Sequence, residues 1–191
     1  VSPRQLMQQG FPLFVEQTVQ ATGIKPAELR LEITETALLD APQQAARVLA
    51  GLREFGVKIY LDDFGTGYSS LSHLHKLPVD ALKIDRSFVR GLLVDDRPAI
   101  VESILALART LHTNVVAEGV EEEGQADQLE RLGCQFAQGF YFSRPQPAAA
   151  IEQLLTAGRP LGATRTTSPA ERAQLALVGG RARTDARAQS R

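Results

Sequence analysis

Cysteine, tryptophan and long apolar runs are scarce or absent in this chain of 191 residues. It has one cysteine and no tryptophan, which excludes a disulfide framework and indicates a reducing compartment. No apolar run reaches the roughly 20 residues that a membrane span needs, and the start, VSPRQLMQQG, lacks the apolar core of a signal peptide. These absences predict a soluble, cytoplasmic protein. Hydrophobic residues make up 43% of the chain, which is enough for a buried core.

The chain also lacks an excess of positive charge, because its formal net charge is −1. Seven arginines lie in residues 159–191 against Glu171 and Asp185, so the rest of the chain is acidic. An acidic body argues against binding a nucleic-acid polymer through a broad basic surface, but it permits a small phosphate ligand if metal ions offset the carboxylates. We expect residues 1–158 to form one domain and residues 159–191 to form a flexible tail rich in Arg and Ala. Contact of this basic tail with nucleic acid or anionic lipid is the alternative.

The order of predicted strands and helices indicates the fold class. The predicted strands are 29–34, 57–61, 81–84, 114–117 and 134–137, and the predicted helices are 4–22, 42–55, 69–75, 98–111, 122–132 and 147–155. Pro12 is expected to kink or split the first helix. Strands that alternate with helices predict an α/β protein with a parallel sheet, either open or closed into a barrel.

Polar residues recur at the ends of these strands, and this pattern favours the barrel. Polar groups at the C-terminal ends of successive parallel strands are typical of an α/β-barrel active site. An open doubly wound sheet would instead carry a glycine fingerprint after its first strand. Neither GxGxxG nor GxxxxGK[ST] occurs in the chain.

The densest of these strand ends is LDDFGTGYSSL, residues 61–71. Neighbouring residues on a regular strand point to opposite faces, but the backbone turns where the strand ends, so Asp62 and Asp63 can converge there. Gly65 and Gly67 permit the backbone angles of such a turn. Paired carboxylates suit a hard divalent cation such as Mg²⁺, and the alternative is that the pair only caps a turn. A kinase is excluded, because the glycine-rich loop and HRD motif that accompany DFG are absent.

Further candidate residues lie on or near the other strands. Glu32 in LEITE is expected to point into the barrel, with Glu35 in the following loop, and a surface position is the alternative for Glu35. Lys83 stands between two apolar residues, and a lysine in a buried strand is costly unless it is paired. Lys83 can orient a water or take its proton, or it can form a structural ion pair with Asp85.

The last two predicted strands add one acid and one amide. Glu118 repeats the pattern of strand, acid and glycine, and Glu121 is expected to interact with the start of the following helix. Gln138 either orients a ligand or satisfies backbone groups. Cys134 is interpreted as a small core residue.

Five ordered segments together resemble the EAL-domain family of cyclic-di-GMP phosphodiesterases. They are EITE (32–35), DDFGTGYSSL (62–71), LPVDALKIDRSFV (77–89), VVAEGVE (115–121) and GCQFAQGFYFSRP (133–145), and the resemblance covers about residues 1–150. It implies a modified (βα)8, TIM-like barrel with one antiparallel strand. It also implies metal-dependent hydrolysis of cyclic di-GMP to linear pGpG by water activated by two Mg²⁺ or Mn²⁺ ions, which would lower cyclic-di-GMP signalling.

The resemblance also implies a role for each matched residue. The acids at strand ends would be metal ligands: Glu32, Asp62, Asp63 and Glu118. Lys83 would contact and help to activate the water, and Gln138 would assist at the water, metal or substrate. Glu35 would hold the loop 64–70, which couples metal binding to dimerisation in this family. Three further residues would have supporting roles: Glu121, Thr66 and Gly67. The implied partners besides cyclic di-GMP are a second copy of the chain and upstream sensor or diguanylate cyclase domains.

The chain departs from the family pattern at its start. The Glu-Ala-Leu tripeptide that names the family, and supplies another metal-binding Glu, does not occur, and the family's Asn would fall just before Val1. A complete α/β barrel takes ~250 residues. We therefore expect an N-terminally truncated domain without its first strand or two, weakly active or inactive alone. The alternatives to a hydrolase are a non-catalytic cyclic-di-GMP receptor and an inert fragment with open, aggregation-prone sheet edges.

Overall fold

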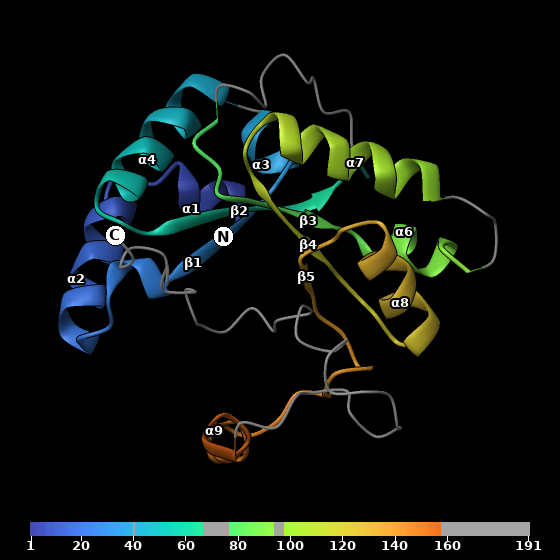
Figure 1. Cartoon of the computed structure of the whole chain (residues 1–191). Coiled ribbons are helices and arrows are strands. Elements are labelled where there is room, and N and C mark those ends of the chain that lie inside the picture. The colour runs from blue at the N-terminus through green and yellow to red at the C-terminus, as the bar shows by residue number, and fades with distance from the viewer. Residues whose placement is uncertain (40, 67–76, 94–97, 158–191) are drawn as a thin grey trace, which may run out of the picture.

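The computed structural model describes residues 1–39, 41–66, 77–93 and 98–157. Strands and helices alternate along this part of the chain around one central sheet (Figure 1). The predicted helix 69–75 and the predicted tail 159–191 lie outside the described residues. No helix in the described ranges has the length and apolar character needed to cross a membrane.

The described strands form one parallel sheet in which each strand lies beside the next one along the chain. They are β1 (Arg30–Thr34), β2 (Lys58–Phe64), β3 (Ala81–Ile84), β4 (Asn114–Ala117) and β5 (Phe136–Ala137). The order β1-β2-β3-β4-β5 has no reversal, and this is the order of a barrel wall, whereas a doubly wound sheet reverses its strand order. The sheet has edges at β1 and β5, so the described part of the chain forms an incomplete barrel. The predicted α/β class is confirmed.

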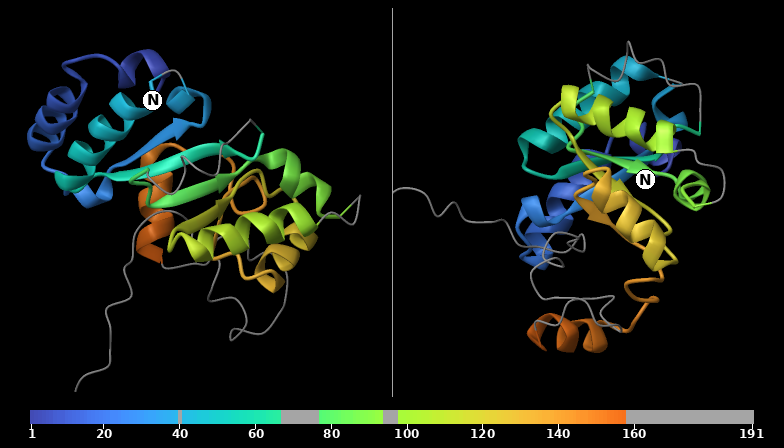
Figure 2. Two further views of the ribbon diagram at one scale, coloured as in Figure 1. Left: turned by 90° about the horizontal axis from the view of Figure 1, so that it is seen from above. Right: turned by 45° about the vertical axis from the view of Figure 1, so that its right-hand side comes forward.

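Helices precede β1 and alternate with the strands after it. They are α1 (Pro3–Leu6), α2 (Phe11–Thr22), the 3₁₀ helix η1 (Pro26–Glu28), α3 (Thr36–Leu39), α4 (Pro42–Glu54), α6 (Arg86–Gly91), α7 (Pro98–Thr110), α8 (Glu123–Arg131) and α9 (Ala148–Ala157). Of these, α1, α2 and η1 precede β1, and α9 lies apart from the sheet (Figure 1). Figures 1 and 2 show α4 beside β2, and α7 along β3 and β4. The apolar residues of α4 and α7 recur at helical spacing, and those facing the sheet are buried: Ala45, Leu49, Leu52, Val101, Ile104, Leu105 and Ala108. Burial of these amphipathic faces is the main source of stability for such helices.

The predicted helix 4–22 is two helices in the structure. The chain leaves α1 after Leu6 and enters α2 at Phe11, with Pro12 in the first turn of α2. A proline is tolerated there because the first backbone N–H groups of a helix have no partner within it. Of the two outcomes expected from Pro12, the split is observed, and Pro12 lies at the start of the second helix rather than at a kink.

The main correction to the predicted strands concerns β2. It does not end at Leu61, because it continues through both aspartates to Phe64. β3, by contrast, has the predicted bounds, and all four of its residues are buried, including Lys83. The aspartates therefore belong to the sheet itself and lie beside the strand that carries the buried lysine.

Candidate active site

The centre of the candidate site is the ammonium group of Lys83, whose side chain is only 4% exposed. Its Nζ lies 2.8 Å from Glu32 Oε1, 2.9 Å from Asp62 Oδ1 and 2.5 Å from Glu118 Oε1. Glu32 belongs to β1, Asp62 to β2, and Glu118 directly follows β4. Four neighbouring strands thus deliver one charged group each to a single point, as predicted for polar residues at strand ends.

A bulge in β2 explains how Asp62 and Asp63 both reach this point. Leu61 pairs with Leu82, whereas Phe64 pairs with Ile84, so two aspartates on β2 lie opposite one residue of β3. Asp63 has a φ of 54°, in the left-handed region, which aspartate tolerates better than most residues. The predicted convergence is observed, but its cause is a bulge within the strand rather than a turn after it.

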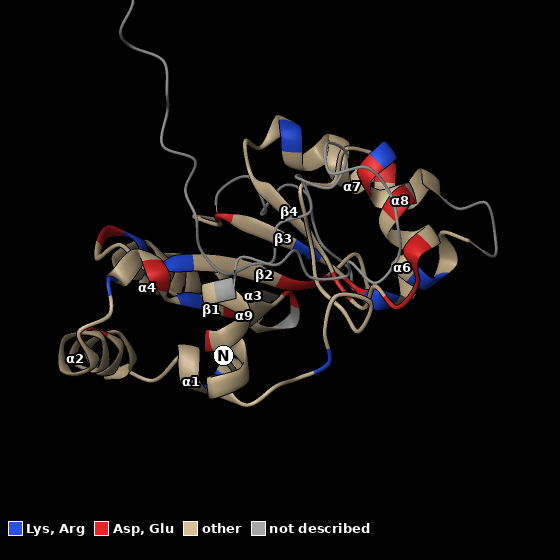
Figure 3. Cartoon of the chain, turned by 60° about the horizontal axis from the view of Figure 1, so that its bottom comes forward, with Lys and Arg blue, Asp and Glu red and all other residues tan. Residues whose placement is uncertain are grey.

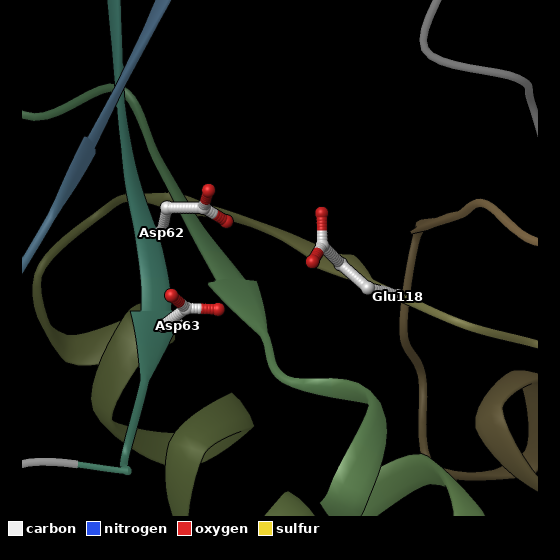
Figure 4. Close-up of side chains that lie close together, drawn as sticks. All are labelled: Asp62, Asp63 and Glu118. Carbon is white, nitrogen blue, oxygen red and sulfur yellow. The ribbon is translucent and has the colours of Figure 1, made fainter. Parts of the chain in front are cut away.

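The two aspartates face Glu118 across the end of the sheet. Figure 4 shows Asp62 and Asp63 projecting from β2 toward Glu118, and one carboxylate oxygen from each of the three lies within 4.8 Å of the others. Figure 3 shows acidic segments gathered where β2 ends, on the side of the sheet toward α6. This arrangement concentrates negative charge opposite a single buried ammonium.

Gln138, which directly follows β5, holds Glu118 in place. Its side-chain Nε2 donates to Glu118 Oε1 over 2.6 Å, and its backbone N–H donates to the Ala117 carbonyl over 2.8 Å. The next residue, Gly139, packs so tightly that an added Cβ would lie 2.1 Å from the Val120 carbonyl oxygen. Glycine is therefore required at this position for Gln138 to approach Glu118.

The electrostatics of the cluster keep Lys83 positively charged. Burial alone lowers the pKa of the Lys83 ammonium, but the close contacts with the carboxylates of Glu118, Glu32 and Asp62 outweigh burial and raise this pKa above its ordinary value. Burial raises the pKa of the Glu118 carboxyl, and the Lys83 ammonium only partly offsets this effect. Lys83 is thus an ammonium donor in this arrangement.

Asp85 does not form the alternative ion pair with Lys83. Its carboxylate accepts hydrogen bonds from the Ser87 backbone N–H, at 2.9 Å, and from the Ser87 hydroxyl, so it caps α6. These bonds outweigh the effect of burial and lower the pKa of Asp85. Burial, followed by the charges of Asp62 and Asp85, raises the pKa of Asp63. Asp85 therefore adds negative charge next to the cluster, a role that its position two residues after Lys83 did not reveal.

The remaining predicted residues lie around the cluster rather than in it. Glu35 is buried, and neither of its carboxylate oxygens has a hydrogen-bond partner in the described ranges. The Thr66 hydroxyl donates to the Asp63 carbonyl over 2.8 Å and closes the turn after β2, while Gly67 lies outside the described residues. Glu121 forms an exposed ion pair with Arg90 of α6 at 2.9 Å, so it is directed toward α6 and not toward Glu118.

One residue near the site was not predicted. Gln125 in α8 is buried, and its side-chain Oε1 accepts hydrogen bonds from the backbone N–H groups of Glu121 and Glu122 at 2.8 and 3.1 Å. It fixes the segment that follows Glu118 at the start of α8. The Glu-x-x-Gln spacing of a capping box, from Glu122 to Gln125, is the signal that could have identified it.

The donor set fits a hard divalent cation. The clustered groups are carboxylate oxygens, which Mg²⁺ and Mn²⁺ prefer to the sulfur and imidazole ligands of softer metals. Asp62 Oδ1 is buried, and although it lies 2.9 Å from Lys83 Nζ, it has no well-aligned hydrogen-bond donor. An oxygen in this state is available as a ligand.

Fold and site together define an α/β-barrel domain with a carboxylate–lysine centre at the C-terminal ends of its strands. The EAL domain family matches residues 1–145, and the chain belongs to this family. The cyclic di-GMP phosphodiesterase NbdA of Pseudomonas aeruginosa is 46% identical over 146 residues, which cover 76% of this chain and 19% of that protein. The chain thus spans between 19% and 28% of the length of the first curated relatives it matches.

Solved structures of related domains have the same fold. The PaMucR phosphodiesterase in complex with c-di-GMP gives a TM-score of 0.76 at 43% identity, covering 79% of this chain and 62% of that chain. The manganese and cyclic-di-GMP complex of Klebsiella pneumoniae BlrP1 gives a TM-score of 0.68 at 35% identity, covering 74% and 36%. These comparisons confirm the predicted family and the predicted fold class, an incomplete TIM-like α/β barrel.

Proposed function

We propose that the domain containing this chain hydrolyses cyclic di-GMP to linear pGpG in the presence of Mg²⁺ or Mn²⁺. The observation that carries the proposal is the meeting of Glu32, Asp62 and Glu118 at the Lys83 ammonium. Relatives named as cyclic di-GMP phosphodiesterases support the substrate. A manganese complex of a related domain supports the ion class.

The carboxylates would hold two divalent ions in this proposal: Glu32, Asp62, Asp63 and Glu118. When bound, such ions neutralise charge at the phosphodiester and lower the pKa of a water. The need for them follows from the charge of the site, because four carboxylates and one ammonium leave three negative charges uncompensated. These charges alone would repel a ligand that carries two phosphate groups.

Lys83 is proposed as a catalytic donor rather than a base. Because its ammonium stays protonated among three carboxylates, it can orient a water by donating to the water oxygen, or stabilise charge on a phosphate oxygen. Taking a proton from the water requires a neutral amine, which the surrounding carboxylates disfavour.

Gln138 is proposed to position Glu118. Its side-chain nitrogen donates to Glu118 Oε1, and such bonds fix the orientation of a carboxylate ligand. We therefore favour this role over a direct contact between Gln138 and the substrate. Glu121 and Thr66 would support the backbone segments that follow Glu118 and Asp63.

Glu35 is proposed to hold the loop 64–70. Its buried carboxylate has no hydrogen-bond partner among the described residues, and a buried acid of this kind is costly without one. By the same family resemblance we propose that the domain forms a homodimer and acts downstream of sensor or diguanylate cyclase domains. We also propose residues 1–158 as the domain portion and residues 159–191 as the tail.

The test is product analysis with the purified, complete domain that contains this chain, since the 191 residues alone are expected to be weakly active or inactive. Cyclic di-GMP and Mg²⁺ should yield pGpG by chromatography, EDTA should stop the reaction, and Lys83→Ala should nearly abolish turnover. The control is Lys58→Ala, because Lys58 pairs with Asp80 instead of the cluster. Binding of cyclic di-GMP without any product would favour the receptor, and normal turnover by Lys83→Ala would remove Lys83 from the mechanism.

A further inference from the structure

We infer that Lys83 is the internal counter-cation of the acidic cluster and competes with divalent cations for Glu32, Asp62 and Glu118. This inference rests on the proposed metal-dependent function and goes beyond a role in orienting water. By this inference, the Lys83 side chain lowers the affinity of the site for divalent cations.

The first support is the number and burial of the contacts. Three carboxylates lie 2.5–2.9 Å from one ammonium nitrogen, and an ammonium group has three N–H donors. The Lys83 ammonium therefore lies in contact with three candidate metal ligands at once. The Lys83 side chain is 4% exposed, and the side chains of Asp62 and Glu118 are 23% and 17% exposed, so water weakens these two contacts less than the contact with Glu32, which is 47% exposed.

The second support is the state of Glu118. Its Oε1 pairs with the Lys83 ammonium and accepts a hydrogen bond from the Gln138 amide. A carboxylate oxygen has two lone pairs, so both are in use. A cation that binds this oxygen while Gln138 keeps its hydrogen bond must take the place of the Lys83 ammonium. A cation bound to the other oxygen of Glu118 would still be repelled by the nearby ammonium.

The third support is that cationic side chains of β2, α4 and α6 form ion pairs elsewhere. Lys58 and Arg53 pair with Asp80 at 3.1 and 3.6 Å, and Arg90 pairs with Glu121. Within the described ranges, Lys83 makes all the ion pairs to the three carboxylates of the cluster. Removing its charge would leave like charges facing one another until a metal ion enters.

The experiment compares the wild-type full chain with Lys83→Met, which keeps the length of the side chain but removes its charge. Lys58→Met is the matched control, since it removes a paired lysine from the same sheet. Thermal unfolding in EDTA is followed by circular dichroism, and Mn²⁺ binding is measured at pH 8 from the electron paramagnetic resonance signal of the free ion.

We expect Lys83→Met to be less stable in EDTA, with a melting temperature ~5 °C or more below that of Lys58→Met. We also expect it to bind Mn²⁺ about tenfold or more tightly than the wild type, the usual scale of coupling between ligands of one protein. Mn²⁺ should then restore the lost stability. If Lys83→Met does not fold in EDTA, refolding on addition of Mn²⁺ is the supporting result.

Equal or weaker Mn²⁺ binding by Lys83→Met would overturn this inference while leaving the proposed function intact. A Lys83→Met chain that stays unfolded at saturating Mn²⁺ would also overturn it. If no variant and no wild-type protein binds Mn²⁺, the proposed function and this inference fail together.

Discussion

Replacing Gln138 with methionine should weaken metal binding while leaving the fold intact. Methionine has a similar length but no N–H group, so the 2.6 Å hydrogen bond to Glu118 Oε1 is lost. The backbone contact from Gln138 to Ala117 does not involve the side chain and is retained. The substitution therefore tests the orientation of Glu118 separately from the packing of β5.

The size of the effect follows from the state of Glu118, whose side chain is 17% exposed and keeps Lys83 as a second partner. Loss of a residue that orients a metal ligand typically costs 10–100-fold in affinity, and the remaining Lys83 contact places this change near the lower limit. Tenfold corresponds to about 1.4 kcal/mol, which agrees with a net value of roughly 1.5–3 kcal/mol for a hydrogen bond to a charged group.

The assay is Mn²⁺ titration of Gln138→Met, with Gln135→Met as control because Gln135 is exposed and precedes β5. The Mn²⁺ concentration for half-maximal hydrolysis should rise by the same factor as the dissociation constant. Unchanged Mn²⁺ affinity in Gln138→Met would refute the positioning role. Lys83→Met is expected to bind Mn²⁺ more tightly, whereas Gln138→Met is expected to bind it more weakly. A non-specific disturbance of the site would weaken binding in both variants and therefore cannot explain both results.

Two further predictions concern the backbone and the single thiol. Gly139→Ala should destabilise the protein severely, because the new Cβ would lie 2.1 Å from the Val120 carbonyl oxygen. The control is Gly51→Ala in α4, where the new Cβ meets nothing within 4 Å, and this variant should be more stable than the wild type by about 0.5–1 kcal/mol in urea unfolding. Equal stability of the two variants would contradict this prediction. Burial raises the pKa of the Cys134 thiol from 9.0 to about 11, so the folded state retains its proton more tightly. The neutral thiol therefore contributes to the free energy of unfolding. This contribution is complete below pH 9, and roughly 2 kcal/mol of it should be lost as the pH rises to 11. Urea unfolding of Cys134→Ala should lack this part of the pH dependence, and an unchanged dependence would argue against it.

The sequence predicted the longer elements because their apolar periodicity is local. β3 and β4 have the predicted bounds, and α4 and α7 end within one residue of theirs. The helices α3 and α6 were missed, since segments of 4 and 6 residues are too short to show a helical period. The exact break in the first helix could not be predicted from apolar periodicity, because α2 begins at Phe11 after the N-cap residue Gly10.

The candidate residues were also identified by a local signal, namely a charged side chain at the end of an apolar strand. Their contacts could not be predicted in the same way. Asp85 was the expected alternative partner for Lys83 because it is two residues further along the chain, yet it caps α6 through Ser87. The actual partners lie 51, 21 and 35 positions away in the sequence, and only strand order and register bring them together.

The bulge in β2 shows why the register matters for the chemistry. In a regular strand Asp62 and Asp63 would point to opposite faces, and only one of them could join the cluster. The extra residue between the pairs Leu61–Leu82 and Phe64–Ile84 places both opposite Lys83. Two carboxylates held this close repel one another, and the left-handed backbone at Asp63 adds a further cost. Such an arrangement is stable only next to positive charge, and the structure supplies that charge from the one residue of β3 that faces the bulge. The lysine and the bulge therefore depend on each other, which is why replacing Lys83 should alter both the stability of the metal-free protein and its affinity for cations.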